Sequence, residues 1–346
     1  MTAVKTPHIL CIRFSAMGDV AMTVPVLMAL TRRYPNLEIT VVSKPFFKPF
    51  FEPLERVHFF EADVKNTYKG AVGLYKLYKA LRPKRFTAIA DLHNVIRSNV
   101  LRSFFRLGGN KTAQIDKGRA EKKALIRDKE KVFGQLKTTH ERYAQVFEAL
   151  GYPVDLKGDE VLPKQKLSDD VRDLFGNTPQ KWLGIAPFAA HEGKKYPLEL
   201  MDAVLGASTS KPYKIILFGG GKEETHLLNV FASKYKNCVS VAGKFSFTEE
   251  LALISHLDAM LAMDSGNGHL AALFGVPTIT IWGVTHPYLG FSPYKQPEEN
   301  QVLANREQFP AIPTSVYGNK VPEGYENVMY TIKPETVLAR IAAVLD

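Results

Sequence analysis

The chain has 346 residues, of which 45% are hydrophobic and 23% charged, and its formal net charge at pH 7 is +10. This length suits two domains of roughly 150 residues each, and the composition is typical of a globular protein. No apolar stretch reaches the roughly 18 residues that a membrane helix needs, and no signal-peptide core precedes the first predicted strand, so we expect neither a membrane-spanning nor a secreted protein. Cys11 and Cys238 lie in apolar runs outside any CxxC pair, which favours two buried thiols and a cytoplasmic location.

Much of the positive charge is attributed to residues 111–137. This basic segment has two interpretations: a solvated helix or mobile insertion, or a cationic lip that faces an anionic acceptor or membrane leaflet. Positive charge also suits nucleic acids. However, no zinc-ligand spacing, recognition helix or RNP-like aromatic pair accompanies it, so we expect no nucleic-acid partner.

Strands and helices alternate from the beginning of the chain. Apolar, β-branched runs predict strands, and helical periodicity predicts helices. The strands are expected at 8–14, 37–43, 57–61 and 86–92, and the helices at 20–34, 68–81, 96–107 and 139–150. This alternation is typical of a parallel sheet covered by helices on both faces.

The polar segment 153–178 predicts a linker, and the alternation then starts again. Strands are expected at 182–186, 214–218, 239–242, 260–263 and 278–282, and helices at 197–207, 223–235, 248–256 and 334–345. The predicted fold class is therefore α/β, with two Rossmann-like domains that face each other across a cleft. The domain bounds are 1–160 and 180–333, and a terminal helix over 334–346 is expected to pack at the domain junction.

Residues 264–269, DSGNGH, connect a predicted buried strand to a short apolar helix. Ser265 and Asn267 can cap this helix, and the two glycines let a ligand approach the backbone, so we predict a nucleotide-linked pyrophosphate at the helix start. A purely structural interpretation also stays open, in which Asp264 and Ser265 are N-caps and His269 is half buried.

Two further loops follow strands of the same half. Lys194 and Lys195 precede a helix and can bind phosphate as point charges, or remain solvated. The glycines at 219–221 suit close approach of a phosphate or ribose. The pattern is not GxGxxG, and no acidic residue follows at the spacing of a dinucleotide ribose, so an NAD enzyme is disfavoured.

In the first half, residues 15–19, SAMGD, form the first strand-to-helix turn. Asp19 can accept a hydrogen bond from a sugar hydroxyl and take its proton, or it can complement the helix macrodipole. Asp91, His93, Arg97 and Arg102 follow another predicted strand, where they can bind acidic groups of an acceptor or form the polar end of a helix.

Four stretches, in order along residues 8–290, resemble the motifs of glycosyltransferase family 9, the lipopolysaccharide heptosyltransferases. They are RFSAMGDV from Arg13; DLHN from Asp91, with Arg97 and Ser98; KKYP from Lys194; and DSG from Asp264, followed by HLAA, GVP and WGVTHP. The chain departs from the family pattern at Ser265, where threonine is usual, and at Lys222, where relatives often have an acidic residue. It also lacks the cysteines that many relatives have, here between Phe309 and Met329.

The resemblance implies the GT-B fold and an inverting, metal-independent transfer of a heptose or similar sugar. The implied donor is a nucleotide-diphosphate sugar, typically ADP-heptose, and the acceptor an anionic glycolipid of the lipopolysaccharide inner-core or lipid A type, with no cofactor. By position, the resemblance implies that Asp19 is the general base. The implied donor-binding residues are Lys194, Asp264, Ser265, Gly266 and His269. To these we add Gly220 and Glu223 as predicted donor-binding residues, and we predict that the acceptor is bound by Ser15, Met17, Gly18, Asp91, His93 and Arg97.

We accordingly expect a cytoplasmic enzyme with peripheral contact to the inner membrane surface. Residues 44–51, KPFFKPFF, are either an apolar helix start packed on the sheet or a surface that meets the membrane interface. Two other functions stay open: another GT-B enzyme that acts on a nucleotide sugar without an acceptor, such as an epimerase, and a GT-B-shaped binding protein without catalysis.

Overall fold

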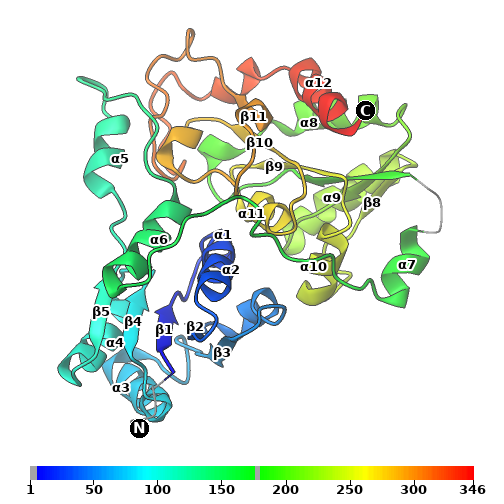
Figure 1. The fold of residues 1–346 in the computed structure, drawn as a ribbon. Helices are drawn as coiled ribbons and strands as arrows, with labels where there is room; N and C mark the ends of the chain where they lie inside the picture. Colours follow the sequence, from blue (N-terminus) through cyan, green and yellow to red (C-terminus); the bar gives the residue numbers. More distant parts are fainter. Residues whose placement is uncertain (1–5, 176–179) are drawn as a thin grey trace. The chain divides into compact units, whose positions relative to one another are not determined.

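The computed structural model describes residues 6–175 and 180–346, and the chain divides into two compact units (Figure 1). Unit 1 runs to Lys117 and resumes over Thr138–Glu160. Unit 2 comprises Gly118–Lys137 and Val161–Asp346. Each unit has its own parallel sheet and its own hydrophobic core.

The sheet of unit 1 has the strand order β3-β2-β1-β4-β5, with all neighbours parallel. Its strands are β1 (His8–Ile12), β2 (Glu38–Ser43), β3 (Val57–Glu61), β4 (Ala88–Asp91) and β5 (Lys111–Gln114). The chain proceeds from β1 to β3 in one direction and resumes on the other side of β1 with β4. The point where the strand order reverses therefore lies between β1 and β4.

Helices cover both faces of this sheet. Helix α2 packs on α6, and α3 packs on α4. Right-handed crossovers place these two pairs on opposite faces, because the chain moves in opposite directions along the sheet in the two halves. The helices of unit 1 are α1 (Met17–Ala21), α2 (Thr23–Arg33), α3 (Gly70–Leu81), α4 (Ile96–Leu107) and α6 (Thr139–Leu150), with 3-10 turns η1 (Pro45–Phe50) and η2 (Arg82–Lys84).

The sheet of unit 2 has the order β11-β10-β9-β6-β7-β8, again parallel. Its strands are β6 (Lys181–Ala186), β7 (Tyr213–Leu217), β8 (Cys238–Ser240), β9 (Ala259–Met263), β10 (Thr278–Trp282) and β11 (Gln301–Leu303). Strands β6 to β8 run toward one edge and β9 to β11 toward the other. The strand order therefore reverses between β6 and β9.

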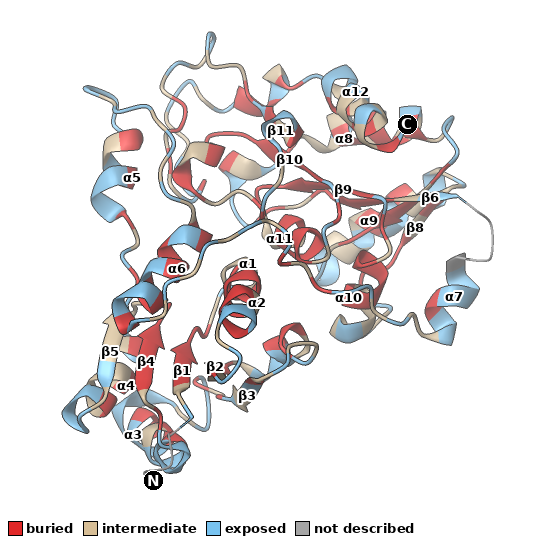
Figure 2. Cartoon of the chain, viewed as in Figure 1, coloured by how far each residue is buried: buried red, intermediate tan, exposed pale blue. Residues whose placement is uncertain are grey.

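The helices of unit 2 include most of those predicted from periodicity. They are α5 (Arg119–Leu125), α7 (Asp169–Phe175), α8 (Leu198–Ser208), α9 (Lys222–Lys234), α10 (Phe247–Ile254), α11 (Gly266–Leu273) and α12 (Pro334–Leu345), with 3-10 turns η3 (Glu192–Lys194), η4 (Pro287–Leu289), η5 (Glu298–Asn300) and η6 (Val328–Thr331). Buried residues gather on the strands of both units (Figure 2).

Residues 118–137, called the strap below, belong to unit 2 and not to the N-terminal domain in which the sequence analysis placed them. The Lys131 ammonium donates to the backbone carbonyls of Ala311 and Pro313 at 2.5 and 2.7 Å. The Arg306 guanidinium lies 3.5 Å from the ring centroid of Phe133. These contacts join the strap to segments of unit 2 that are distant in sequence.

The terminal helix α12 has the predicted bounds and packs on α8 and β9. Val337, Ile341 and Leu345 are buried in the core of unit 2. Its packing at the domain junction stays a prediction.

The structure differs from the sequence analysis in two short strands that were not predicted and in one predicted linker that contains a helix. Strands β5 and β11 were not predicted, since both are short and the polar sequence of β5 hides its pattern. The predicted linker 153–178 contains α7 within its described part, while residues 176–178 lie outside the described residues.

The stretch at η1 packs on the sheet, because Phe47, Phe50 and Phe51 are buried and only Phe46 of these four phenylalanines is exposed. Cys11 and Cys238 are buried free thiols, as predicted. No helix within residues 6–175 and 180–346 is long and apolar enough to cross a membrane.

Candidate active site

The predicted site residues lie where strands end beside the two reversal points. In unit 1, Asp19 follows β1, and His93 follows β4. In unit 2, Lys194 follows β6 and Asp264 follows β9. Ligands of open α/β sheets bind outside the carboxyl ends of the strands at such reversal points, so each unit has a candidate binding site of its own there.

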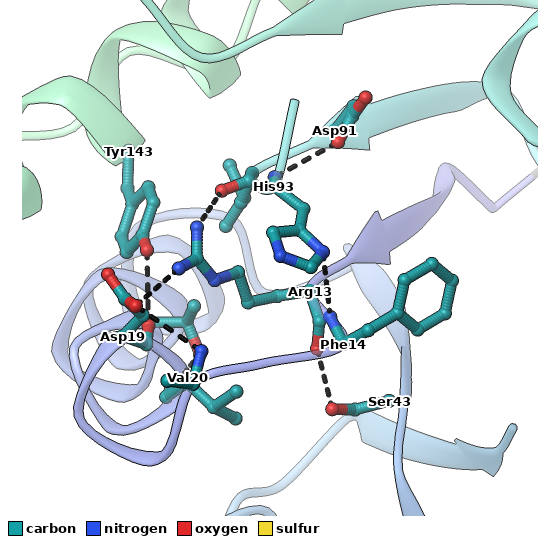
Figure 3. Close-up of polar contacts among 11 residues, drawn as sticks. Arg13, Phe14, Asp19, Val20, Ser43, Asp91, His93 and Tyr143 are labelled. Atoms are coloured by element: carbon teal, nitrogen blue, oxygen red, sulfur yellow. Dashed lines mark hydrogen bonds and ion pairs between the residues drawn. The ribbon is translucent and has the colours of Figure 1, made fainter. Parts of the chain in front are cut away.

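Asp19 is fixed through one of its two carboxylate oxygens (Figure 3). Its Oδ2 accepts from the Arg13 guanidinium at 2.6 Å and from the Ala16 backbone N–H at 3.3 Å. Its Oδ1 accepts no hydrogen bond from the described part of the chain. The Asp19 side chain is 31% exposed, whereas that of Arg13 is 6% exposed. An incoming hydroxyl can therefore reach Asp19 but not its partner.

Arg13 connects Asp19 to two other elements of unit 1. Its Nη1 donates to the Leu92 carbonyl at 2.7 Å, and its guanidinium lies 5.9 Å from the ring centroid of Tyr143. The Tyr143 hydroxyl, from α6, donates to the backbone carbonyl of Asp19 at 3.1 Å. The turn after β1 is thus held by β4 and α6 together (Figure 3).

Asp91 is fully buried and holds the loop after β4. Its Oδ1 accepts from the backbone N–H groups of His93 and Asn94 at 3.0 and 2.9 Å, and its Oδ2 lies 3.6 Å from Nε of Arg102. The carboxylate faces backbone donors and a cation inside the protein, and its contact with an acceptor stays a prediction. Asp91 supports the loop that carries His93.

His93 is a neutral imidazole at physiological pH. Burial, followed by the charge of Arg13, lowers its pKa to about 3. Its Nδ1 accepts from the Phe14 backbone N–H at 3.4 Å (Figure 3), so the proton of the neutral ring is on Nε2.

The remaining predicted acceptor residues lie on the surface of the same edge. Ser15, Met17 and Gly18 are half-buried in the first turn, and Arg97 is exposed at the start of α4.

Cations that the sequence analysis did not select lie beside Arg97 and His93. Burial, and then the charges of Lys65 and Arg97, lower the pKa of Lys44. The charge of Lys117 contributes to the lowered pKa of His93. Lys44, Lys65 and Lys117 each follow a strand of one sheet, and that shared position is the signal that could have identified them. Together they make the carboxyl edge of unit 1 an anion-attracting surface.

In unit 2, Asp264 accepts two bonds on one oxygen. Its Oδ2 lies 2.9 Å from the Lys194 ammonium and accepts from the Thr285 hydroxyl at 2.9 Å. Asp264 and Thr285 are buried, and the Lys194 side chain is 16% exposed. The structure therefore brings together Lys194 and Asp264, and it adds Thr285, which the sequence analysis quoted within a motif but did not select.

Close backbone contacts place Lys194. Gly193 donates to the Gly318 carbonyl at 3.2 Å and accepts from the Val284 N–H at 3.0 Å. A Cβ on Gly193 would meet Val284 Cγ2 at 2.3 Å, and one on Gly318 would meet Lys194 Cγ at 2.5 Å. Both glycines are required, since any side chain would push the Lys194 stem out of place.

The start of α11 agrees with the prediction in part: Ser265 has the N-cap position, but its side chain makes no capping hydrogen bond, and Asn267 lies inside the helix. Ser265 is the N-cap and Gly266 the first helical residue, and the buried Ser265 Oγ has no hydrogen-bond partner among the described residues. His269 is buried in the first turn. A buried hydroxyl without a partner at a helix N-terminus fits an anionic ligand oxygen.

The glycine turn after β7 is bound by a carboxylate that the sequence analysis did not select, and donor binding by Gly220 and Glu223 stays a prediction. The Gly220 N–H donates to Oε2 of Glu224 at 2.8 Å, and Glu223 is exposed. Glu224, not Glu223, is therefore the carboxylate that touches the turn. No three His, Cys, Asp or Glu side chains within residues 6–175 and 180–346 gather as a metal-ligand set.

Comparisons with known proteins agree with this geometry. A model of glycosyltransferase family 9 (heptosyltransferase) matches residues 74–322. The chain is 24% identical over 299 residues to the lipopolysaccharide core heptosyltransferase OpsX of Haemophilus influenzae, covering 84% of this chain and 83% of that protein. It is also 24% identical over 360 residues to lipopolysaccharide heptosyltransferase 2 of Escherichia coli, covering 97% and 98%.

Two solved structures share the fold. The family 9 glycosyltransferase of Veillonella parvula has a TM-score of 0.76 at 18% identity, covering 99% of this chain and 98% of that one. Heptosyltransferase WaaC of E. coli, solved with ADP, has a TM-score of 0.69 at 18% identity, covering 97% and 99%. The predicted fold class, α/β of the GT-B type with two Rossmann-like units, is confirmed.

The family model spans well over half of the chain and includes Lys194 and Asp264, while the first motif, with Asp19, lies before it. The alignments with the two curated relatives cover most of the length of each relative. The chain belongs to glycosyltransferase family 9, the heptosyltransferases.

Proposed function

We propose that this glycosyltransferase moves a heptose from ADP-heptose to a lipopolysaccharide inner-core or lipid A type acceptor, with inversion and without a metal. The observation that carries the proposal is the Asp19 carboxylate, anchored at Oδ2 and open at Oδ1. The names of the relatives support the substrate class, since OpsX is a lipopolysaccharide core heptosyltransferase and WaaC has been solved with ADP-2-deoxy-2-fluoro heptose.

In this proposal unit 2 binds the donor. Lys194 leaves its ion pair with Asp264 in part and binds the diphosphate, whose developing charge it stabilises as the sugar departs. Asp264 then accepts from sugar hydroxyls, held in orientation by Thr285. Ser265, Gly266 and His269 contact the pyrophosphate at the start of α11. Gly220 lets the nucleoside approach the turn after β7, where Glu223 is available to the ribose.

In unit 1, Asp19 takes the proton of the acceptor hydroxyl as that oxygen attacks the anomeric carbon. A positioned general base contributes roughly 10²- to 10⁴-fold to such a step. Because attack and departure occur on opposite sides of the carbon, a single displacement inverts it.

The acceptor is proposed to lie along the carboxyl edge of unit 1. Ser15, Met17 and Gly18 line its reactive end, Nε2–H of His93 is available as a donor, and Arg97 binds acidic groups together with Lys44 and Lys65. The mutual repulsion of these three cations in the free protein would be relieved by an anionic acceptor. Asp91 holds the loop that carries His93, and its own contact with the acceptor stays a prediction.

We also propose that the enzyme works in the cytoplasm, in peripheral contact with the inner membrane surface, and has no nucleic-acid partner. Two free thiols and the absence of a nucleic-acid recognition motif support this.

The test compares Asp19→Asn and Asp19→Ala with Asp159→Asn, an exposed carboxylate of the same unit. We expect both Asp19 variants to lose transfer about 10³-fold, because no base takes the hydroxyl proton, while their affinity for ADP stays as in the unchanged protein. Transfer is measured by the release of ADP with a water-soluble, de-acylated acceptor. Near-normal turnover of Asp19→Ala would contradict the assignment of the base.

The alternative functions give different results in the same assay. An epimerase-like enzyme would convert the sugar donor with no acceptor present, and a binding protein would bind ADP but release none from ADP-heptose. Among solved structures, a UDP-N-acetylglucosamine 2-epimerase of Listeria monocytogenes shares the fold at a TM-score of 0.52 and 9% identity, which shows the fold alone.

A further inference from the structure

Helices α3 and α4 pack side by side on one face of the unit 1 sheet. Their inner sides contribute Leu74, Leu77, Leu101 and Phe105 to the core. Their outer sides are solvent-exposed, and Figure 2 shows much of α3 in the pale blue of exposed residues. The outer sides of these two helices are called the α3–α4 face below.

The α4 part of this face is apolar. Ile96 and Leu107 are each 84% exposed, and the partly exposed Val100 lies one turn after Ile96. Their spacing of four and then seven residues puts all three on one stripe, opposite the buried Leu101 and Phe105. Val100 also packs in part against the core of unit 1, whereas Ile96 and Leu107 expose most of their apolar side chains.

The α3 part mixes apolar and basic side chains. Val72, Tyr75, Lys76 and Lys79 follow the i, i+3, i+4, i+7 spacing of one helix face, and all four are exposed. Val72 is 71% exposed. The Lys79 ammonium lies 5.3 Å from the ring centroid of Tyr75, and the Tyr75 ring packs on Phe104 of α4 at 5.5 Å between centroids. The two helices thus form one continuous surface.

The charge of this region is far from balanced. Residues 64–110 contain ten lysines and arginines and a single acidic residue, Asp91, which is buried. The segment thus has nine of the ten net positive charges of the whole chain. The basic segment 111–137, to which much of the charge was attributed, has nine basic and four acidic residues, and Lys131 within it is bonded to unit 2.

Single exposed apolar residues are ordinary on protein surfaces. The α3–α4 face combines a row of them with lysines and arginines and no exposed acid, which is the composition of helices that lie in a membrane interface. Anionic lipids attract such a face, and the apolar stripe can enter the headgroup region. A nucleic acid would use the charge but leave the exposed side chains of Ile96 and Leu107 without an apolar partner.

We propose that the α3–α4 face docks on the surface of an anionic lipid bilayer. This inference deepens the proposed membrane contact, and to that extent it rests on the proposed function. The aromatic stretch at η1, which the sequence analysis considered for this role, has three of its four phenylalanines buried and is not part of the face.

The position of α4 would place the docked membrane beside the proposed acceptor site. The helix begins with Ile96 and Arg97 at the carboxyl edge, next to His93, and its stripe extends from there to Leu107. At a rise of 1.5 Å per residue the stripe is about 16 Å long. A glycolipid acceptor could keep its acyl chains in the leaflet below this stripe while its sugar reaches the edge of unit 1.

The test measures co-flotation of the full chain with vesicles of phosphatidylcholine, with and without phosphatidylglycerol. We expect binding to the anionic vesicles only, reduced in about 0.5 M NaCl, where the Debye length falls to a few ångströms. The variant Lys76→Glu/Lys79→Glu/Arg82→Glu should bind about 100-fold more weakly, because three attractive charges become repulsive. Val72→Ser/Leu107→Ser should weaken binding about tenfold, because two of the most exposed apolar side chains of the α3–α4 face are lost.

The matched control is Lys164→Glu/Lys236→Glu/Lys295→Glu, which makes the same change of net charge on exposed lysines of unit 2. It should bind vesicles as the unchanged protein does. Three outcomes would each overturn the proposal. The control could lose as much vesicle binding as the triple variant, the triple variant could bind as tightly as the control, or the unchanged protein could bind neutral vesicles as tightly as anionic ones. Tighter binding to a single-stranded RNA than to vesicles would overturn it in favour of a nucleic-acid partner.

All variants are also assayed for transfer to the water-soluble, de-acylated acceptor, which we expect to be unchanged. This separates the two proposals. Loss of vesicle binding with normal transfer supports the α3–α4 face, whereas vesicle binding by a protein that transfers no heptose would contradict the proposed function and leave the face standing.

Discussion

Arg13 is the residue on which the geometry of Asp19 depends. Its guanidinium is buried, contacts Asp19 Oδ2, and donates to the carbonyl of Leu92, which directly follows the neighbouring strand β4. Asp19 is therefore fixed relative to β4 as well as to its own turn. In the proposed mechanism this makes Arg13 a positioning residue, since it acts through Asp19 and is itself too buried to reach a substrate.

We expect Arg13→Gln to lower kcat by about 10- to 100-fold, because small displacements of a catalytic group cost factors of this size. Arg13→Lys keeps one charge on Asp19 and should recover part of the loss. The affinity for ADP, measured by calorimetry, should not change, because the proposed donor site lies in unit 2. Normal kcat in Arg13→Gln, or a loss of ADP binding equal to the loss of kcat, would contradict this role.

His93 gives the protein a predictable sensitivity to acid. Because burial lowers its folded pKa to about 3, the unfolded chain binds the proton first as the pH falls below the usual histidine value. Between about pH 6.5 and 3 this histidine lowers the unfolding free energy as the pH falls, by up to about 1.4 kcal/mol per pH unit. Above that range its contribution is constant.

His93→Asn keeps an acceptor near the Phe14 N–H but does not titrate. In urea unfolding at about pH 7 and about pH 4.5, we expect the variant to lose less stability than the unchanged protein, by about 2 kcal/mol or less. Burial lowers the pKa of His286 as well, to about 4, so His286 remains as a source of acid sensitivity in the variant. Equal losses in the two proteins would show that the pKa of His93 is the same in the folded and unfolded states.

The site residues differ in how far the sequence could identify them. Asp19, Lys194 and Asp264 follow predicted strands, so their place at a strand end could be inferred. Arg13 contacts Asp19, 6 residues away, and Thr285 contacts Asp264, 21 residues away. Sequence periodicity does not predict that these side chains point toward each other. Asp91 has the residue type and position of a ligand-binding carboxylate, but its burial could be seen only once the loop after β4 was built.

At the scale of the elements, alternating apolar runs gave most strands and helices, because buried parallel strands are continuous apolar segments. Helices α4, α6 and α12 have the bounds that were predicted. Edge strands β5 and β11 were missed for the converse reason. One side of an edge strand meets solvent, so its sequence can be polar, as in the KTAQ of β5.

The strap makes contacts that its local sequence does not predict. Its basic composition suggested a solvated helix, yet its attachment depends on Lys131 and on Phe133, which packs on His286 and Tyr288 at 5.2 and 5.0 Å between ring centroids. His286 lies directly after Thr285, the partner of Asp264. The strap therefore lies near Thr285 and Asp264, at the proposed donor site of unit 2.

Lys131→Met removes the two hydrogen bonds to the carbonyls of Ala311 and Pro313 but keeps the length of the side chain. We expect trypsin to cut after Arg127 and Lys129 about tenfold faster in this variant, since the strap opens locally more often. Lys123→Met, an exposed lysine of α5, is the control and should be cut as the unchanged protein is. Equal cutting of the two variants would show that these bonds do not hold the strap.

At the scale of the whole molecule, chain length predicted two domains, and two hydrophobic cores are found. The sequence could not show that the chain passes between the units three times, after Lys117, Lys137 and Glu160. That pattern arises from contacts between the strap and residues 286–313. Such long-range contacts cannot be predicted from the sequence of the strap alone. Unit 2 is consequently built from two separate stretches of chain.

This discontinuity has a consequence for biosynthesis. Unit 1 is complete once residue 160 has left the ribosome, with the strap as a loop between its two parts. The surface that receives the strap is translated later, on the order of 10 s later at 5–20 residues per second. During that interval the Lys131 ammonium lacks its partners, the carbonyls of Ala311 and Pro313, because these are translated later. Unit 1 can thus fold during translation, while unit 2 is complete only after the strap, which is made early, has packed on residues that are made late.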